Sequence, residues 1–259
     1  MSSSATEATS TTASSTSSAS NRPPANLPPA NPLPAARRPD GWANETVIGG
    51  SLPQPSAGKP GAGVEVEVVA CGALAGHIRE IAARRDWPVT VRPLSAALHN
   101  RPQQIKSYAE RMLATPETQG ARTVLGYADC GTYGALDKLA AQAGVNRLPG
   151  LHCYDLYAGA AQVEQLFEEE PGTYLLTDYL IKSFERSVIQ PLGLDRHPDL
   201  WQDYFGHYRR LVWLAQRATP ELEEGAARIA GLFNLPLTRI DTGTRGLEAA
   251  LAQVIEQLP

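Results

Sequence analysis

The sequence predicts an α/β fold, in which a single three-layer domain is built on a mostly parallel sheet and carries an added helical cap. From about residue 63 onwards, short apolar runs alternate with segments of helical periodicity. Two of these runs, 64–70 and 123–128, are followed by a cysteine and a glycine just before a helical pattern begins. A strand of a parallel sheet passes into its crossover helix in this way, and we therefore expect right-handed crossovers.

The individual elements follow from the same periodicities. Strands are predicted where the chain is alternating or continuously apolar, and helices where one face repeats with a period of 3.6 residues. The predicted strands are 64–70, 89–94, 123–128, 173–177 and 235–240, and 147–153 is predicted as a short strand or an extended loop. The predicted helices are 73–85, 103–114, 134–143, 159–169, 179–190, 198–218, 220–233 and 247–257. The long helical stretch 179–233 interrupts the alternation, so we expect it to cap the sheet or to form a lid.

The first 62 residues have a different composition from the rest. Residues 2–20 are almost entirely Ser, Thr and Ala, and residues 23–39 are dominated by Pro, Ala and Asn. Such a segment buries too little apolar surface to offset the entropy of ordering it. We predict a disordered tail over 1–62 and one α/β domain over 63–259.

Charge and composition exclude several classes of function. The net charge is −4, so the sequence predicts neither a nucleic-acid partner nor an anionic membrane surface. No apolar run approaches the roughly 20 residues that span a bilayer. The three cysteines cannot all pair with one another, which favours a reducing compartment and a cytoplasmic location.

All three cysteines lie beside predicted strand ends: Cys71, Cys130 and Cys153. Because the carboxyl ends of parallel strands share one edge of the sheet, these thiols are expected to converge. Convergent thiolates repel one another unless they share a cation. Three protein ligands leave one position open on a zinc ion, or one iron free on a four-iron cluster. The sequence therefore predicts a metal site that holds zinc or an iron–sulfur cluster.

Other residues of the same edge are candidates for binding and proton transfer. We predict that His99, His152, Asp129 and Asp178 orient ligands or move protons. The candidates for cofactor binding are Gly72, Gly131, Thr132 and Thr177, because glycine permits close backbone approach and the threonines stand at strand ends.

Simpler interpretations of these residues remain open. Free cysteine is among the most buried residue types, so the thiols could only pack. Asp178 could be a helix cap, and each histidine could be a solvated or satisfied core residue. The segment 131–134 could hold an anion at a helix N-terminus, and Cys130 could be a thiol activated there.

Several short blocks resemble an uncharacterised prokaryotic family, catalogued as domain of unknown function 1638. The blocks are Ala70-Cys71-Gly72, Leu98-His99-Asn100, Gly126-Tyr127-Ala128-Asp129-Cys130-Gly131, His152-Cys153, and Pro171-Gly172-Thr173 with Leu176-Thr177-Asp178. The resemblance covers about residues 64–250 and implies a cytoplasmic α/β protein. Some relatives are associated with corrinoid-dependent methyl transfer, which implies a link to one-carbon metabolism and a corrinoid or methyltransferase partner. It implies no established reaction.

Two functions are therefore expected. The first is a metal- or iron–sulfur-binding protein with a three-cysteine site at the strand ends. The second is a metal-free module that binds a small molecule of corrinoid type, in which the cysteines only pack. The sequence does not decide whether the chain is an enzyme.

Overall fold

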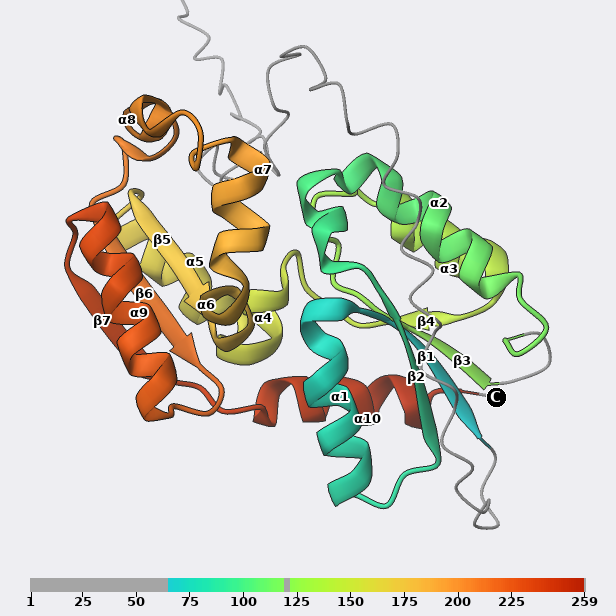
Figure 1. Ribbon diagram of the computed structural model, residues 1–259. Helices are drawn as coiled ribbons and strands as arrows, with labels where there is room; N and C mark the ends of the chain where they lie inside the picture. The colour runs from blue at the N-terminus through green and yellow to red at the C-terminus, as the bar shows by residue number, and fades with distance from the viewer. Residues whose placement is uncertain (1–64, 119–121, 259) are drawn as a thin grey trace, which may run out of the picture.

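The computed structural model describes residues 65–118 and 122–258, and the predicted tail over 1–62 lies outside the described residues. The described chain forms two lobes, each built on its own parallel sheet (Figure 1). The α/β class with parallel sheets is thus confirmed. The strands divide between two sheets, whereas the sequence predicts one.

The first lobe contains the sheet β2-β1-β3-β4, in which every pair of neighbours is parallel. Its elements are β1 (Val66–Cys71), α1 (Gly72–Arg84), β2 (Val89–Leu94), the 3₁₀ turn η2 (Ala96–Asn100), α2 (Pro102–Leu113), β3 (Arg122–Gly126), α3 (Ala135–Ala143), β4 (Asn146–Arg147) and the C-terminal helix α10 (Arg245–Glu256). Helices α1 and α10 cover one face of the sheet, and α2 and α3 cover the other (Figure 1).

The second lobe contains the sheet β5-β6-β7, again parallel throughout. Its elements are α4 (Cys153–Ala158), α5 (Ala160–Glu169), β5 (Thr173–Thr177), α6 (Asp178–Phe184), the π-helical turn η3 (Glu185–Ile189), α7 (Gln190–Leu192), the 3₁₀ turn η4 (Pro198–Leu200), α8 (Trp201–Phe205), β6 (Arg210–Ala215), α9 (Pro220–Phe233) and β7 (Leu237–Asp241). Helices α6 and α9 pack on one face of this sheet, and α5 packs on the other.

Strand β6 corrects the helix predicted over 198–218. Trp213 of this strand packs with the aromatic cluster on one face of the sheet, whereas Val212 and Leu214 pack against the α5 side. This alternation is the period of a strand. The helical spacing of the aromatic residues upstream belongs to the short helix α8, which ends before Gly206. The prediction extended that helix through a residue of poor helix propensity and was wrong from there on.

A second correction concerns Cys153. The segment 147–153 is predicted as a short strand or an extended loop, and only its first residue, Arg147, belongs to a strand, because β4 ends there. Cys153 therefore begins helix α4 and does not end a strand. Two backbone hydrogen bonds still tie this region to the end of β3, from the amides of Asp129 and Cys130 to the carbonyls of Gly150 and Leu151.

The C-terminal helix α10 returns from the second lobe to the first. Leu247, Leu251 and Val254 are buried in the same core as β1 and β3. At the start of α10 the backbone passes so close to α4 that a Cβ on Gly246 would lie 2.5 Å from the carbonyl oxygen of Leu156. The first lobe is therefore completed by the end of the chain.

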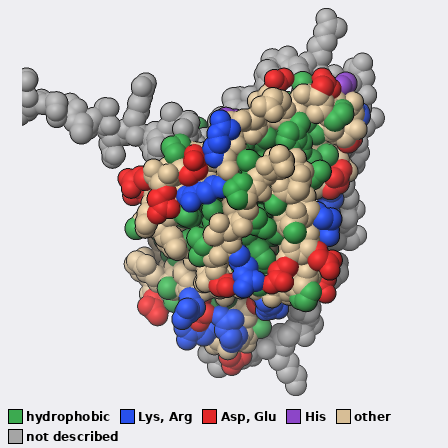
Figure 2. All heavy atoms as spheres, turned by 90° about the vertical axis from the view of Figure 1, so that its left-hand side faces the viewer, with side chains coloured by type: hydrophobic (Ala, Val, Ile, Leu, Met, Phe, Trp, Pro, Cys, Tyr) green, Lys and Arg blue, Asp and Glu red, His purple; other side chains and the backbone are tan. Residues whose placement is uncertain are grey.

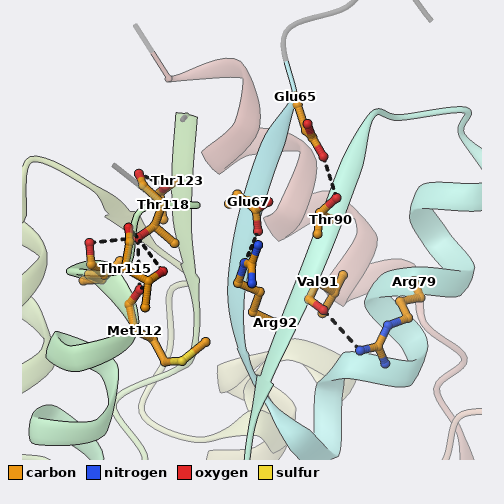
Figure 3. A network of polar contacts seen from close by, with 11 residues as sticks. Glu65, Glu67, Arg79, Thr90, Val91, Arg92, Met112, Thr115, Thr118 and Thr123 are labelled. Carbon is orange, nitrogen blue, oxygen red and sulfur yellow. Dashed lines mark hydrogen bonds and ion pairs between the residues drawn. The ribbon is translucent and has the colours of Figure 1, made fainter. Parts of the chain in front are cut away.

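A polar network supports the amino-terminal half of the first sheet (Figure 3). Glu67 on β1, which is only 5% exposed, pairs with Arg92 on β2 at 2.8 Å. The hydroxyl of Thr90 donates to Glu65 one step nearer the strand starts. Cross-strand pairs of this kind fix the register of β1 against β2. They stand at the opposite end of the strands from the predicted site.

The outer face of the second lobe is mixed in character. Figure 2 shows apolar side chains gathered there with charged side chains around them. Leu232 on α9 is 56% exposed. On the edge strand β7, Arg239 pairs with Glu223 at 2.6 Å and with Asp241 at 3.2 Å. Charged side chains on an edge strand oppose pairing with a further strand.

Candidate functional site

The strand order of the first sheet determines where its crevice lies. From β1 the chain moves outward to β2 and then crosses back to β3 on the other side of β1. In open α/β sheets, ligands bind outside the carboxyl ends of the strands at this reversal. Cys71 is the last residue of β1, and Cys130 follows β3. The two thiols therefore flank the crevice, as the sequence predicts.

His99 contacts both of these thiols. Its ring nitrogens each lie 3.9 Å from Sγ of Cys71. Nδ1 also lies 3.0 Å from the carbonyl oxygen of Ala96, so Nδ1 carries a proton and donates it there. Cys130 forms a hydrogen bond with the same ring.

Cys71 and His99 form a charged pair. Burial alone would raise the pKa of Cys71, but the charge and hydrogen bond of His99 outweigh it and lower that pKa. Burial likewise opposes the charge on His99, but Cys71 and Cys130 hold its pKa well above the ordinary value. The two shifts favour a thiolate on Cys71, which is completely buried, beside an imidazolium on His99.

Cys153 completes the group of three thiols. Burial first, and the charge of Cys130 second, raise the pKa of Cys153 far above its ordinary value. It is therefore a neutral thiol. Because Cys71 and Cys130 both contribute to this shift, all three sulfur atoms interact electrostatically. They come from the end of β1, the loop after β3 and the start of α4.

The loop that carries Cys130 is strained. Cys130 and Tyr133 both have φ of +52°, in the left-handed region that non-glycine residues rarely adopt. The carboxylate of Asp129 holds this conformation by accepting hydrogen bonds from the amides of Tyr133 (2.9 Å) and Gly134 (2.7 Å) and from the hydroxyl of Thr132 (3.1 Å). Asp129 thus clamps the loop on which Cys130 stands.

Asp178 has a similar role in the second lobe. Its carboxylate accepts hydrogen bonds from the indole nitrogen of Trp213 (2.9 Å) and from the amides of Gln216 (3.2 Å) and Arg217 (2.7 Å). Thr177 precedes it as the N-cap of α6 and accepts from the amide of Leu180 at 3.2 Å. Both predicted acids therefore use their oxygens to hold backbone, and neither lines the pocket.

A pocket of about 350 Å³ lies between the two lobes. The first lobe and the start of α4 supply thiol and imidazole groups, and the second lobe supplies mainly aromatic and aliphatic side chains. The described lining residues are Ala73, Ala96, His99, Asn100, Cys130, Gly131, His152, Cys153, Tyr154, Tyr174, Thr177, Tyr179, Leu180, Ser187, Val188, Leu192, Tyr204, Phe205, His207 and Tyr208.

The pocket brings together many of the residues predicted from the sequence, but not all of them. Those that line it are His99, Cys130, Gly131, His152, Cys153 and Thr177. Those that do not are Cys71, Gly72, Asp129, Thr132 and Asp178. Gly72 is explained by packing, because a Cβ there would lie 2.7 Å from the carbonyl oxygen of Leu94. Burial lowers the pKa of His152, whose ring stacks on that of Tyr154.

Two features of the site are not among the site residues predicted from the sequence. The aromatic wall includes Tyr174, Phe205 and Tyr208. The sequence allows Tyr208 to line a pocket lid, but aromatic residues at helical spacing favour a core stripe. The other feature is Tyr127, whose hydroxyl is buried without a hydrogen-bond partner among the described residues. Burial and the charges of Cys71 and Cys130 raise its pKa.

Metal binding is not prearranged in this geometry. In the described ranges 65–118 and 122–258, no three or more His, Cys, Asp or Glu side chains are grouped so that they could hold a metal ion. His99 forms hydrogen bonds with Cys71 and Cys130, and Cys153 interacts with these groups electrostatically.

Comparison with known proteins gives one match. A family model described as "Protein of unknown function (DUF1638)" matches residues 93–251, which include His99, Cys130 and Cys153 and begin after Cys71. No curated protein and no solved structure matches the chain. Within the residues described, no helix is both long and apolar enough to cross a membrane.

Proposed function

The chain belongs to the DUF1638 family, whose function is unknown, and we propose that it binds a small molecule between its two lobes. The observation that carries this proposal is the pocket of about 350 Å³, which both lobes line. Its volume falls in the range of about 300–1,000 Å³ that is usual for small-molecule sites. It also opens beside the thiols and imidazoles that the sequence singles out.

The shape of the pocket supports a compact ligand. One wall carries Cys130, Cys153 and His99, and the facing wall carries the aromatic residues of the second lobe. Such a ligand contacts both lobes at once. A corrinoid or a methyltransferase protein as the partner stays a prediction that rests on the resemblance alone, and no catalytic step is assigned.

Filling the pocket tests this function. We expect Ala96→Phe to place a ring in the pocket, whereas Ala97→Phe is a matched control because Ala97 is exposed on the same 3₁₀ turn and does not line the pocket. A collection of small molecules is screened by thermal unfolding, since a ligand that binds the native state raises Tm. Compounds should stabilise wild type and Ala97→Phe but not Ala96→Phe. A screen without such compounds contradicts the proposal.

Metal binding is a second candidate function, favoured by the convergence of the thiols on His99. Metal-binding histidines usually donate their other ring N–H to a carbonyl or carboxylate, and Nδ1 of His99 already donates to Ala96. The hydroxyl of Tyr127 has no hydrogen-bond partner among the described residues, and the charges of Cys71 and Cys130 act on it. In a metal site, this hydroxyl could donate a hydrogen bond to a metal-bound thiolate. Zinc or an iron–sulfur cluster would bind Cys71, Cys130 and Cys153 after these side chains rotate from their present positions.

Elemental analysis with an absorption spectrum, on protein purified without oxygen, tests this second function. Stoichiometric zinc or iron is expected in wild type and in Ala96→Phe, which alters the pocket but no thiol. Cys130→Ala should lose most of the metal. A folded wild type without metal, or a Cys130→Ala protein with unchanged metal, contradicts it.

A further inference from the structure

We propose that the pocket between the lobes selects an uncharged, ring-containing compound that carries hydrogen-bond acceptors. The inference rests on the proposed function, because it takes the pocket to be a ligand site and names the chemical class of the ligand. Three features carry it: the absence of Asp, Glu, Lys and Arg from the described lining, the rigid aromatic wall, and the phenol hydroxyls that point to no protein partner.

None of the described lining residues is Asp, Glu, Lys or Arg. The two acids at the adjoining strand ends, Asp129 and Asp178, use their oxygens to accept hydrogen bonds within the protein. His99 lines the pocket, but Cys71 and Cys130 raise its pKa, so its charge is already engaged within the protein. An ionised phosphate or carboxylate that entered the pocket would therefore lose its hydration without meeting a Lys or Arg in the described lining, which is costly.

Helix N-termini offer an anion little compensation at this site. At the start of α6, the amide of Asp178 donates to Oε1 of Gln216 at 3.0 Å, and the amide of Leu180 donates to Thr177. At the start of α4, the carboxylate of Asp155 accepts the amides of Leu151 (2.7 Å) and His152 (3.1 Å). These donors, which would otherwise attract an anion, are already satisfied within the protein.

The aromatic wall is held in place by its own packing. Tyr174 meets Phe205 edge to face at 5.9 Å between ring centroids, and it meets Tyr208 edge to face at 5.0 Å. Edge-to-face pairs are favourable arrangements that restrict the rings. A ligand ring therefore meets a surface that is already ordered, which lowers the entropy lost on binding.

The same wall provides hydrogen-bond donors. Burial raises the pKa of Tyr208 to about 12 and that of Tyr174 still further, so both phenols keep their protons. Neither hydroxyl forms a hydrogen bond with another described residue, although both rings line the pocket. A ligand with a carbonyl or ether oxygen, or an unprotonated ring nitrogen, would accept from them.

Three naphthalenes of nearly equal shape test the inference. The carbonyl of 2-acetylnaphthalene is a neutral acceptor, 2-naphthoate replaces the methyl group by a charged oxygen, and 2-ethylnaphthalene has no acceptor. Calorimetric titration should give 2-acetylnaphthalene an affinity at least about tenfold higher than 2-naphthoate, since the anion is left unpaired. The affinity of 2-acetylnaphthalene should also be at least about threefold higher than that of 2-ethylnaphthalene, because the ethyl compound cannot accept a hydrogen bond from the phenols.

Variants assign these preferences to the wall. The double variant Tyr174→Phe, Tyr208→Phe should abolish the preference for the acetyl compound over the ethyl compound and leave the discrimination against 2-naphthoate. Tyr133→Phe is the control, because Tyr133 is 86% exposed and lies outside the pocket. Its binding should equal that of wild type.

Equal or tighter binding of 2-naphthoate overturns the inference, and so does the absence of binding by all three compounds. The screen with Ala96→Phe and Ala97→Phe separates this failure from that of the proposed function. If that screen yields pocket-dependent ligands that are anions or cations, the pocket binds small molecules but the class inferred here is wrong.

Discussion

The two lobes are built alike but face the pocket with different chemistry. Each has a parallel sheet covered on both faces, and each has an aspartate near the end of a strand that clamps backbone. The first lobe, with the start of α4, presents thiols and imidazoles such as Cys130 and His99, whereas the second presents phenols such as Tyr174 and Tyr208. The first lobe thus supplies groups suited to bond formation or ion binding. The second lobe supplies groups suited to recognition of a ligand.

The two aspartate clamps also differ in reach. Asp129 binds amides four and five residues further along its own loop. Asp178 binds Trp213 and the amides of Gln216 and Arg217, which belong to β6 and the loop after it. The first clamp shapes one loop, and the second joins two strand ends. Their removal should therefore affect stability unequally.

The largest effect is expected for Asp178→Ala. The substitution leaves the buried indole N–H of Trp213, the buried amide of Gln216 and the part-buried amide of Arg217 without an acceptor. This loss should lower the free energy of unfolding by about 3–5 kcal/mol. Urea denaturation measures this loss. Asp178→Asn, which keeps one acceptor oxygen, should lose clearly less. An alanine variant within about 1 kcal/mol of wild type would show that the clamp contributes little.

A smaller effect, about 2–3 kcal/mol, is expected for Asp129→Ala, because its clamp lies within one loop. Burial opposes the charge of Asp129, but hydrogen bonds from Gly134 and Tyr133 outweigh it and lower its pKa. A folded-state pKa below the ordinary value contributes stability above about pH 4, and that stability is lost as the pH falls through the lowered pKa.

Unfolding measured at about pH 6 and about pH 3 separates this contribution from the others. Asp129→Asn should lose less stability than wild type between the two values, because its amide does not titrate. An identical acid dependence in the two proteins would exclude Asp129 as a source of it.

Cys71 and His99 of the first lobe have no counterpart among the described residues of the second, and loss of their interaction should cost about 1–2 kcal/mol near neutral pH. The raised pKa of His99 contributes stability that is lost as the pH rises through it. The lowered pKa of Cys71 contributes stability that is lost as the pH falls through it. The pair is therefore charged between these two values.

Ultraviolet thiolate absorbance of the metal-free protein checks this pair. His99→Asn should abolish the signal at neutral pH, because buried Cys71 then becomes a neutral thiol. The control His152→Asn should leave it unchanged, since burial lowers the pKa of His152 and keeps that ring neutral. A thiolate signal that persists in His99→Asn would assign it to another cysteine.

The smallest effect is expected for Tyr127→Phe, which removes a hydroxyl that has no partner among the described residues. Deleting an unsatisfied buried group should change the free energy of unfolding by about 0–1 kcal/mol, in the stabilising direction. Chemical denaturation of the metal-free protein measures it. A clear destabilisation would show that the hydroxyl has a partner in solution.

The sequence predicts the first lobe better than the second, for a physical reason. Strands β1 and β3 are apolar runs followed by Cys71 and Cys130, so both their type and their functional ends are visible locally. Strand β6 follows closely spaced aromatic residues whose period is helical, and only the pairing with β5 and β7 makes it a strand. The same helical spacing favours a core stripe over a pocket wall for Phe205 and Tyr208, so the sequence does not predict the aromatic side of the pocket.

The roles of the acids also depend on contacts that local sequence does not contain. Asp178 precedes a helix and is plausible as a cap or a catalyst, but its partners lie 35 or more residues away. The convergence of Cys71, Cys130 and His99, in contrast, follows from the rule that parallel strand ends meet at one edge.

Helix α10 has a consequence for how the protein is made. The ribosome completes β4 about 100 residues before α10, which at about 5–20 residues per second is a delay of several seconds. Throughout that interval, the sheet face that Leu247, Leu251 and Val254 will cover lacks its helix. The core of the first lobe is therefore completed only when α10 is made, and a nascent chain must keep this surface from aggregating until α10 emerges.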